Sequence, residues 1–306
     1  MKPSGIWPLL LGTGAMLGLG SPLAKAAAPH GVGTLAFALW PTLAAGLLLG
    51  LLGLVRRGRP VDPLRLLRFG VVAGSFGHAV PMAALYGLSS HAGAGFASLS
   101  LALPPVFTLA ITLLLGLERP AWRRVVAVAL GLAGALLMLG ARGGSFEATP
   151  GTLALALLIP ASIGAANVYR SRRMPPGAGG EWMASSTLLV SCALLGATGA
   201  VVGGLAVPFS GSALGWLGLQ AVALVVGYLF YFALQRRAEP VTFSFIGYVM
   251  MAVGVGIGTL AFDERLPWTV WPALVLVLVA LRLLRSPRPD QHPAPAAPAV
   301  RHGNAA

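Results

Sequence analysis

Residues 118–122 read Glu-Arg-Pro-Ala-Trp, and residues 264–268 read Glu-Arg-Leu-Pro-Trp, 146 positions further along the chain. Each copy follows one long apolar run and precedes another. A repeat of this length within 306 residues indicates two halves that are built alike. The spacing predicts two structural repeats, at residues 1–146 and 147–285. A polar, proline-rich segment at residues 286–306 is predicted to be a disordered cytoplasmic tail.

The composition indicates a membrane protein. Hydrophobic residues make up 57% of the chain and charged residues only 9%, with a mean hydropathy of +0.82. A water-soluble domain carries about 25% charged residues, because they cover its surface. The net charge of +13 does not indicate a nucleic-acid partner, since the arginines lie between apolar runs rather than along one face. The single cysteine, Cys192, excludes an internal disulfide and a cysteine metal cage, and we expect neither metal nor cofactor.

Ten apolar runs approach the roughly 20 residues that cross a bilayer as a helix. They cover residues 7–26, 33–55, 67–87, 93–116, 122–140, 151–170, 183–206, 214–235, 241–261 and 268–285. The sequence therefore predicts an all-α polytopic membrane protein with ten transmembrane helices in two five-helix repeats. Because five is an odd number, the second repeat enters the membrane inverted relative to the first. The first run also resembles a signal peptide that ends at residues 24–26, but the repeat favours its retention.

The basic residues predict the orientation of the helices. With a cytoplasmic amino terminus, 18 lysines and arginines fall on the cytoplasmic side, and only Lys25, Arg142 and Arg265 fall outside. Cytoplasmic loops of membrane proteins carry an excess of positive residues. We therefore expect a multi-pass protein of the inner (cytoplasmic) membrane, in contact with the lipid bilayer, with both termini in the cytoplasm. Monomer and homodimer are both compatible with the sequence.

Two stretches in register carry a family resemblance. Residues 97–105 read Ala-Ser-Leu-Ser-Leu-Ala-Leu-Pro-Pro, and Gly-Leu-Glu-Arg follows at residues 116–119. The second half repeats the pattern at residues 227–234 and again at residues 244–248 and 263–265. Over about residues 7–285 the chain resembles the EamA domain of the drug/metabolite transporter superfamily by its spans and repeats. The resemblance implies a ten-helix secondary transporter, commonly an exporter of amino acids or other small metabolites.

The acidic residues limit the substrate class. All eight of them fall in loops, in the tail or at the ends of the apolar runs. A buried carboxylate is the usual proton carrier and the usual counter-ion for a cationic drug. Their positions favour a small neutral, zwitterionic or anionic substrate. His78 is then the remaining ionisable group expected inside the membrane, and we interpret it as a hydrogen-bonded helix contact, with a cavity contact and a proton carrier as alternatives.

A candidate substrate site combines aromatic residues with single polar groups, as ligand pockets do. We expect it between the third, fourth, eighth and ninth runs, with contributions from the first and sixth. Helical spacing places Tyr228, Tyr231 and Gln235 on one face of the eighth run. The candidate substrate-binding residues are His78, Met82, Ser100, Asn167, Tyr231, Gln235, Ser244, Tyr248 and Trp40. The alternative is ordinary helix packing for all of them, with a lipid-facing ring for Trp40.

Four charged residues mark the ends of the runs. Lys25 and Arg170 are interpreted as side chains that reach the lipid headgroups, with cations lining the two mouths of the pathway as the alternative. We expect Glu118 and Glu264 to cap or tie the turns before the helices that begin at residues 122 and 268, because helix amino termini stabilise negative charge.

The sequence thus predicts a transporter that works by alternating access. Coupling to protons is one alternative, with His78 as the candidate proton carrier. A membrane-embedded enzyme would need clustered carboxylates, histidines or a nucleophile–base pair at one depth. A non-transporting scaffold or sensor would need a soluble domain or a long loop to receive a signal. Two glycine pairs, Gly14 with Gly18 and Gly254 with Gly258, predict close helix contacts rather than phosphate loops, because no strand precedes them.

Overall fold

The computed structural model describes residues 5–60, 62–85, 100–101, 103–117, 122–140 and 150–262, with a few helical residues between 272 and 283. Every regular element in these residues is a helix. The turns that contain Glu118 and Glu264 lie outside the described residues, as does the tail at residues 286–306.

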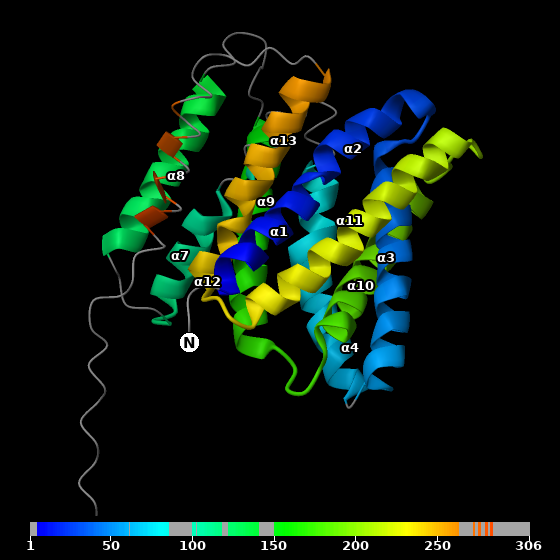
Figure 1. Ribbon diagram of the computed structural model, residues 1–306, viewed down its shortest axis with the longest axis horizontal. Coiled ribbons are helices and arrows are strands. Elements are labelled where there is room, and N and C mark those ends of the chain that lie inside the picture. The colour runs from blue at the N-terminus through cyan, green and yellow to red at the C-terminus, as the bar shows by residue number, and fades with distance from the viewer. Residues whose placement is uncertain are drawn as a thin grey trace, which may run out of the picture.

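Figure 1 shows the helices as a bundle of long rods with several interruptions. In chain order they are α1 (Ile6–Gly18), α2 (Gly20–Ala27), η2 (Ala28–His30), α3 (Thr34–Arg57), α4 (Pro63–Gly74), η3 (Ser75–Ala79), α7 (Pro104–Leu114), α8 (Trp122–Gly140), α9 (Pro150–Arg173), α10 (Gly180–Val202), α11 (Gly211–Gln235), α12 (Pro240–Ser244) and α13 (Ile246–Phe262). Helix continues beyond η3 as far as residue 85.

Six helical stretches of the described chain are long and apolar enough to cross a membrane, judged by length and composition. They are Ile6–His30, Thr34–Arg57, Pro63–Leu85, Gly180–Val202, Gly211–Gln235 and Pro240–Phe262. These stretches coincide with the first, second, third, seventh, eighth and ninth predicted runs. Helices also occupy the predicted fifth and sixth positions as α8 and α9. The helical membrane class is confirmed, while the count of ten spans and their inverted repeat remain predictions.

Local sequence signals explain where several helices begin and end. Asp62 caps α4, because its carboxylate accepts a 2.9 Å hydrogen bond from the Arg65 backbone N–H, and Pro63 occupies the first helical position. Ser210 caps α11 in the same way through the backbone N–H of Ala213. Gly58 ends α3 with a φ of +69°, a conformation that favours glycine.

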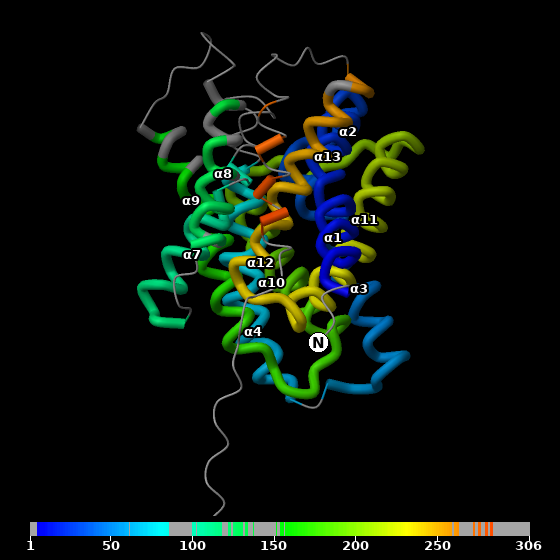
Figure 2. The backbone as a smooth tube through the Cα atoms, turned by 60° about the vertical axis from the view of Figure 1, so that its left-hand side comes forward, coloured from blue at the N-terminus to red at the C-terminus, as the bar shows by residue number. Residues whose placement is uncertain are grey.

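The helices of the two predicted repeats pack against each other. α3 runs along α10 and α11, α4 packs on α10, and α1 lies between α11 and α13. α7 packs on α9, beside which it lies in Figure 2, and α8 lies beyond α7 at the outer edge of the bundle in Figure 1. Because α1 to α8 belong to the first predicted repeat and α9 to α13 to the second, the middle of the bundle is formed by both.

Small residues set the distance between α1 and α13. A Cβ on Gly14 would overlap the side chain of Val249, and one on Gly18 would lie 2.9 Å from Cα of Met250. Neither position admits a larger side chain unless the helices separate. The predicted close helix contact at this glycine pair is confirmed.

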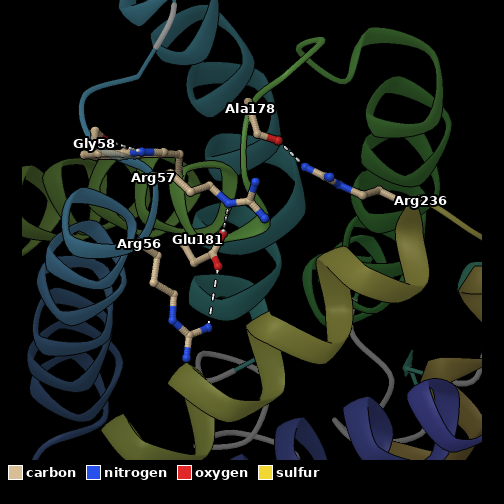
Figure 3. Close-up of polar contacts among 7 residues, drawn as sticks. Arg56, Arg57, Gly58, Ala178, Glu181 and Arg236 are labelled. Carbon is tan, nitrogen blue, oxygen red and sulfur yellow. Dashed lines mark hydrogen bonds and ion pairs between the residues drawn. The ribbon is translucent and has the colours of Figure 1, made fainter.

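Polar contacts join several helices at one end of the bundle (Figure 3). Arg57 Nε lies 3.2 Å from the carboxylate of Glu181, and Arg56 Nη1 lies 3.8 Å from it, which ties the end of α3 to the start of α10. Arg236, after α11, donates to the backbone oxygen of Ala178. Burial lowers the pKa of Arg236, the nearby Arg57 lowers it further, and Glu181 raises it. This end thus gathers three arginines around one nearly buried glutamate.

Different contacts join the helices at the opposite end. A Cβ on Gly31, in the loop before α3, would lie 2.9 Å from Pro208, in the loop before α11. The indole N–H of Trp40 donates a 2.9 Å hydrogen bond to the backbone oxygen of Leu205. Each end is therefore tied by contacts between α3 or its loops and a segment of the second predicted repeat.

Candidate substrate pocket

A pocket lies in the middle of the bundle, lined by residues of seven of the predicted runs, the first to fourth, the sixth, the eighth and the ninth. Its walls are mostly apolar, with a few hydroxyl, amide and imidazole groups, as is typical of small-molecule sites. The polar lining residues are Ser21, Thr42, His78, Asn167, Gln220, Tyr228, Tyr231 and Ser244. The apolar lining includes Leu17, Phe37, Met82, Leu85, Leu224, Phe243 and Met250.

Three helix irregularities meet at this pocket. The first span is interrupted at Leu19 between α1 and α2, and the ninth at Phe245 between α12 and α13. The third contains η3, a π-helical turn in which the Val80 N–H bonds to the Ser75 oxygen. Residues beside each irregularity line the pocket. Interrupted and π-helical turns in membrane helices are often found at functional sites, because they redirect side chains and free backbone groups.

The π-helical turn places His78 on the pocket wall. Its Nδ1 lies 2.9 Å from the hydroxyl of Tyr228 on α11, and its Nε2 lies 3.3 Å from the hydroxyl of Thr42 on α3. The ring is 7% exposed. Both nitrogens therefore have partners, and the imidazole combines two of its predicted roles, the contact between helices and the contact with a cavity.

Arg170 lies directly behind the pocket wall. Its side chain is fully buried, and its guanidinium donates to the hydroxyl of Tyr231, to the backbone oxygen of Ala73 at 2.9 Å and to the side-chain oxygen of Asn167 at 3.5 Å. The guanidinium also lies 5.1 Å from the centre of the Tyr231 ring. Gly77 makes room for it, because a Cβ at that position would overlap Nη2. The guanidinium is thus held by three groups that belong to the pocket wall or its support.

The predicted position of Arg170 was wrong. A side chain that reaches the headgroups would be exposed, whereas this one is fully buried between α9, α11 and the stretch of α4 and η3. The helix α9 continues to Arg173, so Arg170 lies about one turn inside its end and turns toward Gly77 rather than outward. The available signal was its spacing of three residues from Asn167, which puts both side chains on one helical face.

The structure brings five of the nine candidate substrate-binding residues to the pocket. They are His78, Met82, Asn167, Tyr231 and Ser244. Four others lie elsewhere: Ser100, Gln235 and Tyr248 are buried in helix contacts, and Trp40 is 42% exposed on the outside. Sequence reasoning missed Thr42, Gln220 and Ser21 as lining residues. Helical spacing could have found Gln220, because it lies on the same face of α11 as Tyr228 and Tyr231. It had placed Tyr228 on the correct face of α11.

Of the remaining charged candidates, Lys25 is exposed at the end of α2, with its ammonium 4.7 Å from the ring centre of Phe262. That position agrees with a side chain near the membrane surface. No group of three or more metal-ligating side chains is found among the described residues.

Residues 5–140 match the model of the EamA-like transporter family. This segment is therefore similar to that family. The matched segment coincides with the first predicted repeat, and it is the domain of the drug/metabolite transporter superfamily. The predicted resemblance is confirmed for these residues, and the matched family is a family of transporters.

One solved structure, titled only "Crystal structure of protein", resembles this protein over most of its length. The match covers 90% of this chain and 96% of the other, with a TM-score of 0.71 and 22% sequence identity. At this identity the similarity establishes the fold alone. No curated protein matches the chain significantly.

Proposed function

We propose that this protein is a secondary transporter that exports a small neutral, zwitterionic or anionic metabolite, such as an amino acid, by alternating access. The observation that carries the proposal is the central pocket, which is lined by helices of both predicted repeats and lies beside three helix irregularities. A site between two related halves can face either side of the membrane as the halves rock around it.

The contacts at the two ends of the bundle support this mechanism. Arg57 with Glu181 joins α3 to α10 at one end, and Trp40 with Leu205 joins α3 to the segment after α10 at the other. A transporter needs one set of contacts to open while the other closes. We propose that these two sets are the inner and outer gates.

The charges of the described helices support the substrate class. α10 carries an acidic residue, Glu181, in its first turn. This carboxylate pairs with Arg56 and Arg57 and does not line the pocket. The wall carries Tyr231, Asn167 and His78 instead, with the cation Arg170 behind them. Permanently cationic solutes would gain no counter-ion there, whereas neutral or anionic solutes find hydrogen-bond donors.

The orientation follows the positive-inside rule, with both termini in the cytoplasm of an inner-membrane protein. Arg56, Arg57, Arg236 and Arg237 lie at the end where Gly5 also lies, since a Cβ on Gly5 would be 3.2 Å from the Arg237 guanidinium. That end is assigned to the cytoplasm. Arg170 does not contribute to the count, because it is buried inside the bundle.

Flux measurements in proteoliposomes test the proposal. Purified protein is reconstituted, and uptake and release of amino acids and organic acids are followed with and without a pH gradient. We expect at least one solute to move faster than in protein-free vesicles, and its flux to saturate. Flux that is indifferent to every solute and to every gradient would refute a transport function.

A further inference from the structure

The buried guanidinium of Arg170 lies next to the proposed substrate pocket and lacks a carboxylate partner among the residues that the structure describes. Among the acidic residues there, Glu181 pairs with Arg56 and Arg57, and Asp62 pairs with Arg65. The partners of Arg170 are an amide oxygen, a phenol and a backbone oxygen, and its buried Nε has no hydrogen-bond partner within the described part of the chain. A buried charge is costly without a counter-charge, so this site favours the approach of an anion.

Tyr231 connects that charge to the pocket. Because the guanidinium donates to the phenol oxygen, the Tyr231 O–H remains available to donate to another group, and the positive charge polarises it. The ring lines the pocket, stacks on Tyr228 with 5.2 Å between centroids, and packs edge-on against Phe243 at 4.6 Å. These contacts fix the position of the ring and therefore of its hydroxyl oxygen.

Two further groups add positive potential or donors at the same wall. The oxygen of Asn167 faces Arg170, which leaves the two N–H groups of its amide to donate. The first residues of α13, Ile246 and Gly247, also line the pocket, so the positive end of that helix dipole is directed there. The rest of the lining is largely apolar, with Leu17, Phe37 and Leu224.

We propose that the pocket recognises a carboxylate group on a small molecule with an apolar body. The carboxylate accepts hydrogen bonds from Tyr231 and Asn167, and Arg170 is a positioning residue that orients Tyr231 and supplies the positive charge from behind the wall. This inference rests on the proposed transport function for its biological meaning, but it concerns binding and is tested by binding.

The test compares acids with uncharged analogues of the same shape. Purified protein is titrated with a series of alkanoates, arylalkanoates such as 3-phenylpropanoate, and α-amino acids, each beside its carboxamide. We expect one or more acids to bind at least about tenfold more tightly than the matching amide, as charge-assisted hydrogen bonds imply. Amides that bind as tightly as their acids, or no binding by any acid in the series, would overturn the proposal.

Variants then assign the preference to Arg170. Arg170→Gln should reduce the ratio of amide to acid dissociation constants toward one, and Arg170→Lys should restore part of it, whereas a purely structural role would weaken both ligands equally. Arg172→Gln removes a charge from an exposed position on the same helix and should leave the ratio unchanged. If Arg170→Gln does not fold, Tyr231→Phe tests the same preference, because it removes the donor and keeps the ring. An unchanged ratio in the folded variant would contradict the assignment.

Flux separates this inference from the proposed function. Selective binding of acids without any transport in proteoliposomes would refute transport and leave the carboxylate site intact. Transport of uncharged solutes by a protein that does not prefer acids would support the transport function and refute the carboxylate site.

Discussion

The hydroxyl of Tyr228 lies 2.9 Å from Nδ1 of His78, and this contact joins α11 to the π-helical turn of the third span. The other ring nitrogen faces Thr42 on α3 at 3.3 Å. A neutral imidazole has one donor and one acceptor nitrogen, so the two hydroxyls satisfy it in either tautomer. His78 therefore links three helices beside the pocket, and any movement of α11 relative to α3 has to change its hydrogen bonds.

Replacing His78 with glutamine tests whether this link carries a proton. Glutamine keeps one donor and one acceptor but does not titrate between pH 5 and 8, where an ordinary histidine does. If His78 is the coupling group, we expect the variant to lose the acceleration of flux by a pH gradient while still binding substrate. The measurement is transport against pH for wild type and His78→Gln. Superimposable profiles would leave His78 a helix contact only.

Gly77→Ala should disturb the pocket from behind. The added methyl would overlap Nη2 of Arg170, whose buried guanidinium would have to break its hydrogen bonds to Tyr231 and Ala73 to move away. Overpacking of this kind costs about 1–3 kcal/mol. We expect a lower melting temperature and weaker substrate binding. Gly215→Ala, on an open face of α11 with nothing within 4 Å, is the control and should be neutral or slightly stabilising. Equal behaviour of the two variants would mean that the guanidinium does not need this space.

Glu181→Gln should loosen one end of the bundle more than it destabilises the fold. The Arg56 and Arg57 side chains are 60% and 52% exposed, so solvent screens both pairs and each contributes about 0–1 kcal/mol. We expect a small decrease in melting temperature but faster labelling of a cysteine placed at Ser244, which lines the pocket. Asp62→Asn is the control. It removes the exposed ion pair between Asp62 and Arg65 and keeps a side-chain oxygen that can cap α4. Labelling that is no faster in Glu181→Gln than in this control would argue against a gate at this end.

Cysteine labelling tests the proposed orientation. In a Cys192→Ser background, single cysteines replace Arg57, the last residue of α3, and Ser210, which precedes α11, at opposite ends of the bundle. A membrane-impermeant maleimide added outside intact cells should label the Ser210 position and not the Arg57 position, and disruption of the membrane should expose both. Labelling of both from the outside is incompatible with the orientation.

The helical membrane class could be predicted from the sequence because it depends on local properties. Runs such as residues 34–57 and 211–235 are long and apolar, and a bilayer leaves a chain of that kind few structures other than helix. The glycine spacing from Gly14 to Gly18 likewise predicted a close contact, since it concerns one face of one helix. The family resemblance rested on short motifs in register, and the match at residues 5–140 confirms it.

The residues that line the pocket could be predicted only in part. Tyr231 and Asn167 were found because polar groups inside apolar runs need partners, and both lie at the wall. Gln235 and Tyr248 follow the same pattern and lie elsewhere, because helical spacing fixes a face but not the helix that this face meets.

By itself, the sequence determined that the chain is a helical membrane protein, that its first part resembles the EamA-like transporter family and where six long apolar helical stretches lie. Only the tertiary structure decided that Arg170, at the end of an apolar run, turns inward through the space left by Gly77 and supports Tyr231 from 61 residues away. The physical reason is the direction of one long side chain. That direction depends on which neighbours leave room and offer hydrogen bonds, and those neighbours come together only when α4, α9 and α11 pack.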